Sequence, residues 1–291
     1  MSSGTPSLPA HLLAGLTFRD EPLPLDLARD NLVVCRTNGG RLALFIPQRG
    51  PGPAHAGDAL ADHLLLKNLA LFGDEGGAAP VRAGAHELVA PGSLYDLDGE
   101  GKTEDLRWEV SGPSARIVPV RGATMALCEL DALSLPPAAF VPTSPGPKFI
   151  NFGSFIQGYG AEDPQSGVWR QDAGGVVYFL APVTLPHRAF VISGELYIAD
   201  FSAEAGHDIS ARLDRIDRAR NVSEMVRLRS RGASGRQDLI HAGVLGHRVD
   251  NHSEAFHIHV TWQYPATPHQ QDLRLYGARV VFLPRALNQL A

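Results

Sequence analysis

His257 and His259 are separated by a single residue, and their type and spacing could most directly do chemistry. The run around them alternates between apolar and polar residues: Phe256, Ile258, Val260, Trp262 and Tyr264 against His257, His259, Thr261 and Gln263. This alternation predicts a β-strand with one apolar face and one polar face. On such a strand the two imidazoles lie on one side, about 7 Å apart along the backbone, a spacing that lets both bind one metal ion.

A metal site would need further ligands beyond this pair. Four other histidines in the same region could supply a third ligand: His241, His247, His252 and His269. A cupin-type site would also place a glutamate shortly after the pair, whereas the next acidic residue after His259 is Asp272. Two other interpretations stay open: histidines that face solvent, or a ligand-binding face on which imidazole and amide groups form hydrogen bonds. The candidate ligand-binding residues are His257, His259, Gln263 and Tyr276.

Known catalytic motifs are missing from the rest of the sequence. There is no nucleophile elbow, phosphate-binding loop, dinucleotide fingerprint or His-Glu-x-x-His pair. Cys35 and Cys128 each lie in an apolar run and are expected to be buried thiols, and without a Cys-x-x-Cys there is no zinc ribbon. The question of enzyme activity stays open, with a non-catalytic protein favoured. No cofactor is expected, and a divalent transition metal at His257 and His259 is the alternative.

Charge and hydropathy exclude several classes of protein. The net charge of −5, and a basic segment without interleaved aromatic residues, argue against nucleic-acid binding. That segment, residues 212–236, contains eight arginines and is expected to be a solvated helix and loop with Arg–Asp pairs, an anionic partner being the alternative. The N-terminus has no signal-peptide pattern, and no apolar run reaches 18 residues. We therefore expect a cytoplasmic protein that does not insert into membranes.

The pattern of short apolar runs predicts an all-β, mostly antiparallel fold. The chain is rich in turn formers, with 30 glycines and 22 prolines, and Asn38-Gly39 between residues 31–36 and 41–47 is a strong hairpin signal. One or two short helices are expected, at residues 58–72 and within 209–229, although residues 64–71 are apolar enough for a strand. The predicted architecture is two tandem jelly-roll-like β-sandwiches.

An internal echo suggests that the two sandwiches are related. Gly92-Ser93 is followed by Trp108, and Gly153-Ser154 is followed at the same spacing by Trp169. This repeat predicts an N-terminal module at residues 1–141 and a C-terminal module at 148–291, joined by the proline-rich segment 136–147. The two tryptophans are expected to anchor equivalent cores, and platforms for stacking sugars are the alternative.

The same stretches carry a family resemblance. The run from Gly92 to Glu100 and from Leu106 to Ile117 resembles the β-sandwich modules that accompany bacterial glycosyltransferases and other cell-surface polysaccharide proteins. The run from Glu162 to Leu180 is similar to their companion form, and Asp272 to Leu283 to their closing strand. The resemblance covers about half of the chain and leaves residues 1–85 unexplained. It implies a jelly-roll sandwich with an accessory role near glycans, and no catalytic residues.

Three functions follow as hypotheses. The first is a non-catalytic protein that binds carbohydrate, or docks onto a polysaccharide-processing protein, in bacterial cell-surface polysaccharide handling. The second is a metal-dependent cupin-like β-barrel enzyme that uses His257 and His259. The third is a structural subunit of a larger assembly. The sequence leaves open whether the chain forms a homo-oligomer.

Overall fold

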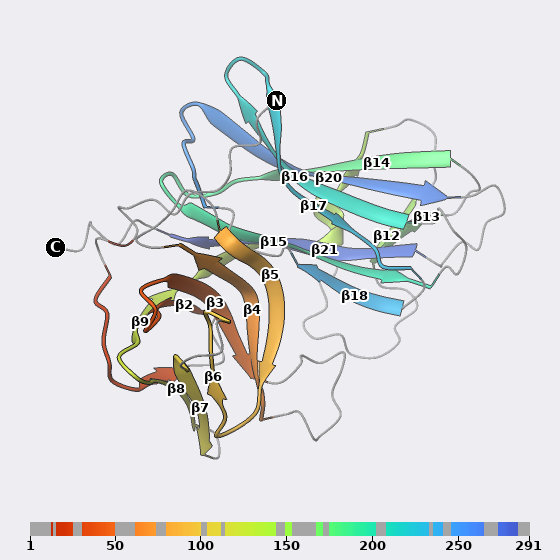
Figure 1. Ribbon diagram of the computed structural model, residues 1–291. Coiled ribbons are helices and arrows are strands. Elements are labelled where there is room, and N and C mark those ends of the chain that lie inside the picture. The colour runs from red at the N-terminus through yellow and green to blue at the C-terminus, as the bar shows by residue number, and fades with distance from the viewer. Residues whose placement is uncertain are drawn as a thin grey trace.

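The computed structural model describes a chain that is built from strands. The described residues are 13, 16–25, 31–49, 62–73, 80–99, 104–111, 114–143, 149–152, 167–170, 175–201, 208–232, 235–240, 246–264 and 273–284. The strands in these ranges pair in an antiparallel manner and form four sheets, which we label A to D (Figure 1). The predicted all-β, antiparallel sandwich fold is confirmed. No helix in this part of the chain is long and apolar enough to cross a membrane.

The first sandwich consists of sheets A and B. Sheet A has the order β5 (Pro80–Val89), β4 (Leu64–Phe72), β3 (Leu42–Arg49), β2 (Asn31–Arg36) and β9 (Thr124–Glu129). Sheet B has the order β1 (Leu23–Leu25), β8 (Ser114–Pro119), β7 (Leu106–Ser111) and β6 (Leu94–Tyr95). The expected hairpin around Asn38-Gly39 is confirmed, because β2 pairs with β3. Trp108 lies fully buried in the core of this sandwich.

The second sandwich consists of sheets C and D. The main path of sheet C is β12 (Phe149–Phe152), β13 (Gly167–Arg170), β21 (Leu273–Leu283), β15 (Phe190–Asp200) and β18 (Gly235–Ile240). Two shorter strands join it, β10 (Asp131–Leu135) on β21 and β19 (His247–Arg248) on β15. Sheet D has the order β11 (Val141–Pro142), β14 (Gly175–Val183), β20 (Glu254–Tyr264), β16 (Asp208–Asp217) and β17 (Val222–Arg229). The apolar residues between the sheets form the largest core, which includes Trp262.

The two sandwiches connect their strands differently. In the first, β2 to β5 and β6 to β8 are consecutive neighbours within one sheet. In the second, the chain alternates between facing sheets from β13 to β16 and again from β19 to β21, as in a jelly roll. Trp108 therefore lies in a strand that pairs with the next strand of the chain, whereas the strand of Trp169 pairs with β12 and β21. The expected internal repeat is not confirmed by these connections.

A third core cluster joins the two sandwiches. Its residues come from sheet A and from one end of β15 and β21: Leu32, Val34, Leu42, Leu44, Ile46, Ala70, Phe72, Cys128, Phe190, Ile192, Val281 and Leu283. Strands β2, β3 and β4 of sheet A thus have buried residues on both faces. Only Leu130 separates β9 from β10, and it packs against this cluster. The buried Glu195 of β15 also faces Lys67 of β4, with 3.9 Å between Oε1 and Nζ.

The proline-rich segment is not the linker that the sequence predicts. It contains a short 3-10 helix, η2 (Pro137–Ala139), and β11, which pairs with β14 of sheet D. Because β10 pairs with β21, residues 131–142 belong to the second sandwich by strand pairing. That residues 1–141 and 148–291 form two separate folding units stays a prediction.

Both expected helices are strands where the structure describes them. Residues 64–72 form β4, the alternative that their apolar character allowed, and residues 58–61 lie outside the described residues. Within 209–229 the chain forms the hairpin of β16 and β17, so the expected helix is wrong. A register shift in this hairpin makes Met225 of β17 an extra residue opposite Leu213 and Asp214, whereas β16 keeps an unbroken register with β20.

Candidate functional site

The central strand of sheet D confirms the predicted alternation. Phe256, Ile258, Val260 and Trp262 of β20 are buried against sheet C. The alternate residues His257, His259, Thr261 and Gln263 therefore lie on the outer face of sheet D. Strands β14 and β16 pair with β20 along its length and place their own alternate residues beside this row. The outer face is thus built from segments that lie far apart in the sequence (Figure 1).

An aromatic platform lies where β14 meets β20. Tyr178 of β14 points outward and is 39% exposed. Its ring stacks on the imidazole of His259, with 5.4 Å between the ring centroids and 12° between the planes. The backbone register explains the contact, because Tyr178 pairs with Thr261 and is the diagonal neighbour of His259. The two rings are therefore nearly parallel and each covers part of one face of the other, while the Tyr178 side chain stays partly open to solvent.

A polar group lies on the other side of the histidine row. Asp214 of β16 is directly opposite His257 and is fully buried, although it lies on the outer face. His257 Nε2 is 3.3 Å from Asp214 Oδ2, and Arg212 Nε is 2.9 Å from the same oxygen. A buried carboxylate is costly unless charged or polar partners lie near it, and these two contacts supply such partners.

Both imidazoles favour the neutral form. Burial lowers the pKa of His257, and the nearby Asp214 carboxylate offsets this only in part. Burial also lowers the pKa of His259, with a smaller contribution in the same direction from the Arg212 guanidinium. At neutral pH each ring can therefore both donate and accept a hydrogen bond.

The outer face has an apolar half and a charged half. The apolar half follows β14 and its edge neighbour β11, with exposed side chains at Val141, Val176 and Tyr178. The charged half follows β16 and β17 and consists of three ion pairs, which are Arg212–Asp214, Arg227–Glu224 and Arg229–Asp208. The row of histidines on β20 runs between the halves. The Arg–acid pairing expected of this segment is thus seen, although on strands and not on a helix.

The structure separates the four candidate residues that the sequence suggests. His257, His259 and Gln263 share the outer face of sheet D, and Gln263 is exposed at the far end of the row. Tyr276 lies on β21 of sheet C, whose inward-facing residues pack against those of sheet D. It is half-buried on the opposite face of the sandwich and does not join the other three. The sequence did not identify Tyr178, Arg212 or Asp214 as part of a site.

The other histidines near the pair in sequence do not complete a metal site with it among the described residues. His247 contacts Glu254, with 2.9 Å between Nε2 and Oε2, and His252 packs edge-on against His187. His241 and His269 lie outside the described residues. Within the described ranges, three acidic residues do lie close enough together to hold a metal ion, with their ligand atoms within 4.8 Å of one another. They are in the first sandwich, away from the histidine pair.

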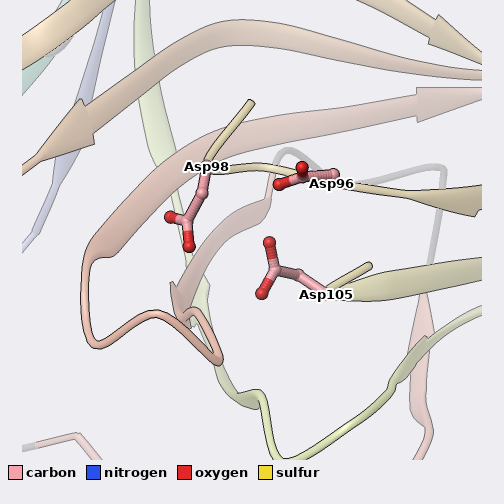
Figure 2. Close-up of side chains that lie close together, drawn as sticks. All are labelled: Asp96, Asp98 and Asp105. Carbon is pink, nitrogen blue, oxygen red and sulfur yellow. The ribbon is translucent and has the colours of Figure 1, made fainter. Parts of the chain in front are cut away.

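That group consists of Asp96, Asp98 and Asp105 (Figure 2). Asp105 is fully buried and accepts hydrogen bonds from the backbone N–H groups of Asn38 at 2.8 Å and Leu97 at 2.9 Å. Asp96 accepts one from the backbone N–H of Gly99. Burial is the main cause that raises the pKa of Asp105, and the two N–H donors oppose it. These bonds join the β2–β3 turn to β6 and β7, which gives the group a structural role in the loops.

This aspartate group was not recognised in the sequence. The available signal was the spacing Asp96-Leu97-Asp98-Gly99, in which two carboxylates alternate before a glycine in a turn. The third member, Asp105, comes from the start of the next strand and could be found only from the pairing of β6 with β7.

The tryptophans and cysteines have structural positions where they are described. Trp108 is buried and donates a hydrogen bond from Nε1 to the Asp62 carbonyl at 2.7 Å, as expected of a core anchor. The side chain of Trp169 lies outside the described part, so its role stays a prediction. Cys35 and Cys128 are buried free thiols, as predicted, and burial raises the pKa of Cys128 to about 12.

Comparisons with known proteins give distant structural similarities. No family model and no curated protein matches the sequence. A β-1,3-glucan-binding CBM6 from Bacillus halodurans aligns at a TM-score of 0.26 and 12% identity, over 53% of this chain and 95% of its own. The tandem CBM22 modules of Paenibacillus barcinonensis Xyn10C align at a TM-score of 0.33 and 7% identity, over 90% of this chain and 84% of their own. The VP2 protein of infectious bursal disease virus aligns at a TM-score of 0.26 and 10% identity, over 87% of this chain and 54% of its own. We draw no functional conclusion from similarities at this level.

Proposed function

We propose that this chain is a non-catalytic protein that binds carbohydrate on the outer face of sheet D. The observation that carries the proposal is the stack of Tyr178 on His259 in an exposed position, next to the fixed polar group of His257, Asp214 and Arg212. A sugar ring has an apolar C–H face and a rim of hydroxyl groups. A flat aromatic surface beside polar side chains offers partners to both.

The protonation of the histidines suits this ligand. Hydroxyl groups both donate and accept hydrogen bonds, and a neutral imidazole can do the same. The lowered pKa values of His257 and His259 keep both rings neutral at neutral pH. Nε2 of His257 faces the Asp214 carboxylate, so the ring nitrogen left for a bound hydroxyl group is Nδ1.

A binding role explains the site better than a catalytic one. Of the three carboxylates described on this face, Asp214 is fully buried next to Arg212 and His257, and Glu224 and Asp208 are paired with Arg227 and Arg229. Metal catalysis at His257 and His259 would need a third ligand, and those described nearby have other partners. The sequence resemblance supports placing the protein in bacterial cell-surface polysaccharide handling, beside an enzyme that processes the polymer.

Calorimetric titration against a panel of purified polysaccharides tests this proposal. We expect at least one glycan to bind, and binding to weaken when Tyr178 is replaced by alanine. Tyr276→Ala is the matched control, because it removes a tyrosine from the other sheet of the same sandwich. If the intact protein bound no glycan in the panel, or if only the Tyr276 variant lost binding, the proposed site would be wrong.

A further inference from the structure

The arginines on the outer face of sheet D already have carboxylate partners. Arg212 pairs with Asp214, Arg227 with Glu224 and Arg229 with Asp208. Hydrogen bonds between the side chains accompany the second and third pairs. The three arginines and three carboxylates of these pairs together carry no net charge.

This pairing works against an anionic ligand. Proteins that recognise carboxylate or sulfate groups usually present an arginine fork that is free to bind them. Here a uronic acid or sulfate would have to displace a carboxylate that is attached to the same sheet. It would also lie close to Asp208, Asp214 or Glu224, and like charges at short distance repel each other.

Among the described residues, the strands β11, β14 and β20 add no charged side chain to this face. The β14 side presents Val176, Tyr178 and the neighbouring Val141, and the imidazoles between the halves are neutral at neutral pH. From His257 to Gln263 the row on β20 covers about 20 Å at 3.3 Å per residue, which is longer than a single sugar ring. A ligand that uses the whole row therefore contains several sugar units.

We infer that the outer face of sheet D selects uncharged glycan chains of several sugar units over uronic-acid or sulfated chains. This inference rests on the proposed function, and it specifies the class of carbohydrate. The carboxylates paired with the three arginines compete with the charge contacts that anionic glycans need. The apolar strip on β14 favours the C–H faces of consecutive neutral sugars.

Titrations at two salt concentrations test the inference. The neutral probes are a β-1,3-glucan, a xylan and a mannan with their short oligosaccharides, and the anionic probes are polygalacturonate, alginate and chondroitin sulfate. We expect a neutral chain to bind, affinity to rise from disaccharide to hexasaccharide, and Kd to change less than about threefold between 50 and 500 mM NaCl. The anionic chains should bind at least about tenfold more weakly than the neutral one.

The variant Glu224→Gln makes the test specific to the ion pairs. It releases Arg227 from its partner, so we expect the variant to bind anionic chains more tightly than the unaltered protein does, in a salt-sensitive manner. Tight, salt-sensitive binding of anionic glycans by the unaltered protein would overturn the inference and leave the proposed function intact. Failure to bind any glycan would remove the proposed function itself.

Discussion

Replacing Tyr178 by alanine should weaken carbohydrate binding by about five- to thirtyfold. A tyrosine side chain offers on the order of 200 Å², and because Tyr178 is 39% exposed, about 80 Å² can be covered by a ligand. At about 25 cal/mol per Å², full coverage of that area contributes ~2 kcal/mol and half coverage ~1 kcal/mol. A loss of ~2 kcal/mol weakens binding about thirtyfold, and a loss of ~1 kcal/mol weakens it about fivefold.

The measurement is isothermal titration of the unaltered protein and the variant with the glycan that binds best. Because the ring is partly exposed and stacks on His259, we expect the free energy of unfolding to fall by no more than ~1 kcal/mol, which circular dichroism during thermal unfolding would check. An affinity unchanged within about twofold in a folded variant would refute the platform, since the calculation allows no smaller effect unless the ligand binds elsewhere.

Three further changes test other parts of the structure. Because the pKa values of His257 and His259 are lowered on folding, their contribution to stability is present above pH ~6.5 and lost as the pH falls. The Tm should therefore drop between pH 7.5 and 5.5, and less steeply when both are replaced by asparagine. Asp105→Ala leaves two backbone N–H groups without their acceptor and should cost about 2–4 kcal/mol in urea unfolding; a loss below ~1 kcal/mol would contradict its structural role. Phe190→Ala should cost about 3–5 kcal/mol, with one unfolding transition for both sandwiches, and a separate unchanged transition of the first would contradict the shared core.

The sequence predicts the central strand of the site well. Strict alternation over residues 256–264 is a local property, and burial of Phe256, Ile258 and Trp262 confirms the expected faces. The hairpin at Asn38-Gly39 is predicted for the same reason, because its signal lies within a few neighbouring residues. Features of this kind need no knowledge of which strands pair.

The partners of the histidines could not be predicted in the same way. Tyr178 lies about 80 residues before His259, and only the register of β14 on β20 brings the rings together. Asp214 and Arg212 lie in a segment where Leu213, Ile216, Val222 and Val226 fall at a rough helical spacing. The sequence therefore predicted a helix there, although the segment forms the hairpin of β16 and β17. Pairing between distant strands depends on the whole sheet, and local patterns do not encode it.

The apparent repeat is not confirmed by the strand connections. Matching spacings before Trp108 and Trp169 suggested two copies of one module, but the strands that follow these residues belong to different arrangements. A glycine, a serine and a tryptophan at one spacing describe a turn and a buried strand, and both are common in β-sandwiches. Similar local chemistry was therefore not evidence of a common topology.

The most direct test of the proposed site is a two-dimensional NMR titration of the protein with a neutral oligosaccharide, with signals assigned on both sheets of the second sandwich. Carbohydrate binding on sheet D predicts that the largest shifts fall on Tyr178, His257, His259 and Thr261, with little change at Tyr276. Shifts concentrated on sheet C or on the first sandwich, with those four residues unchanged, would contradict it.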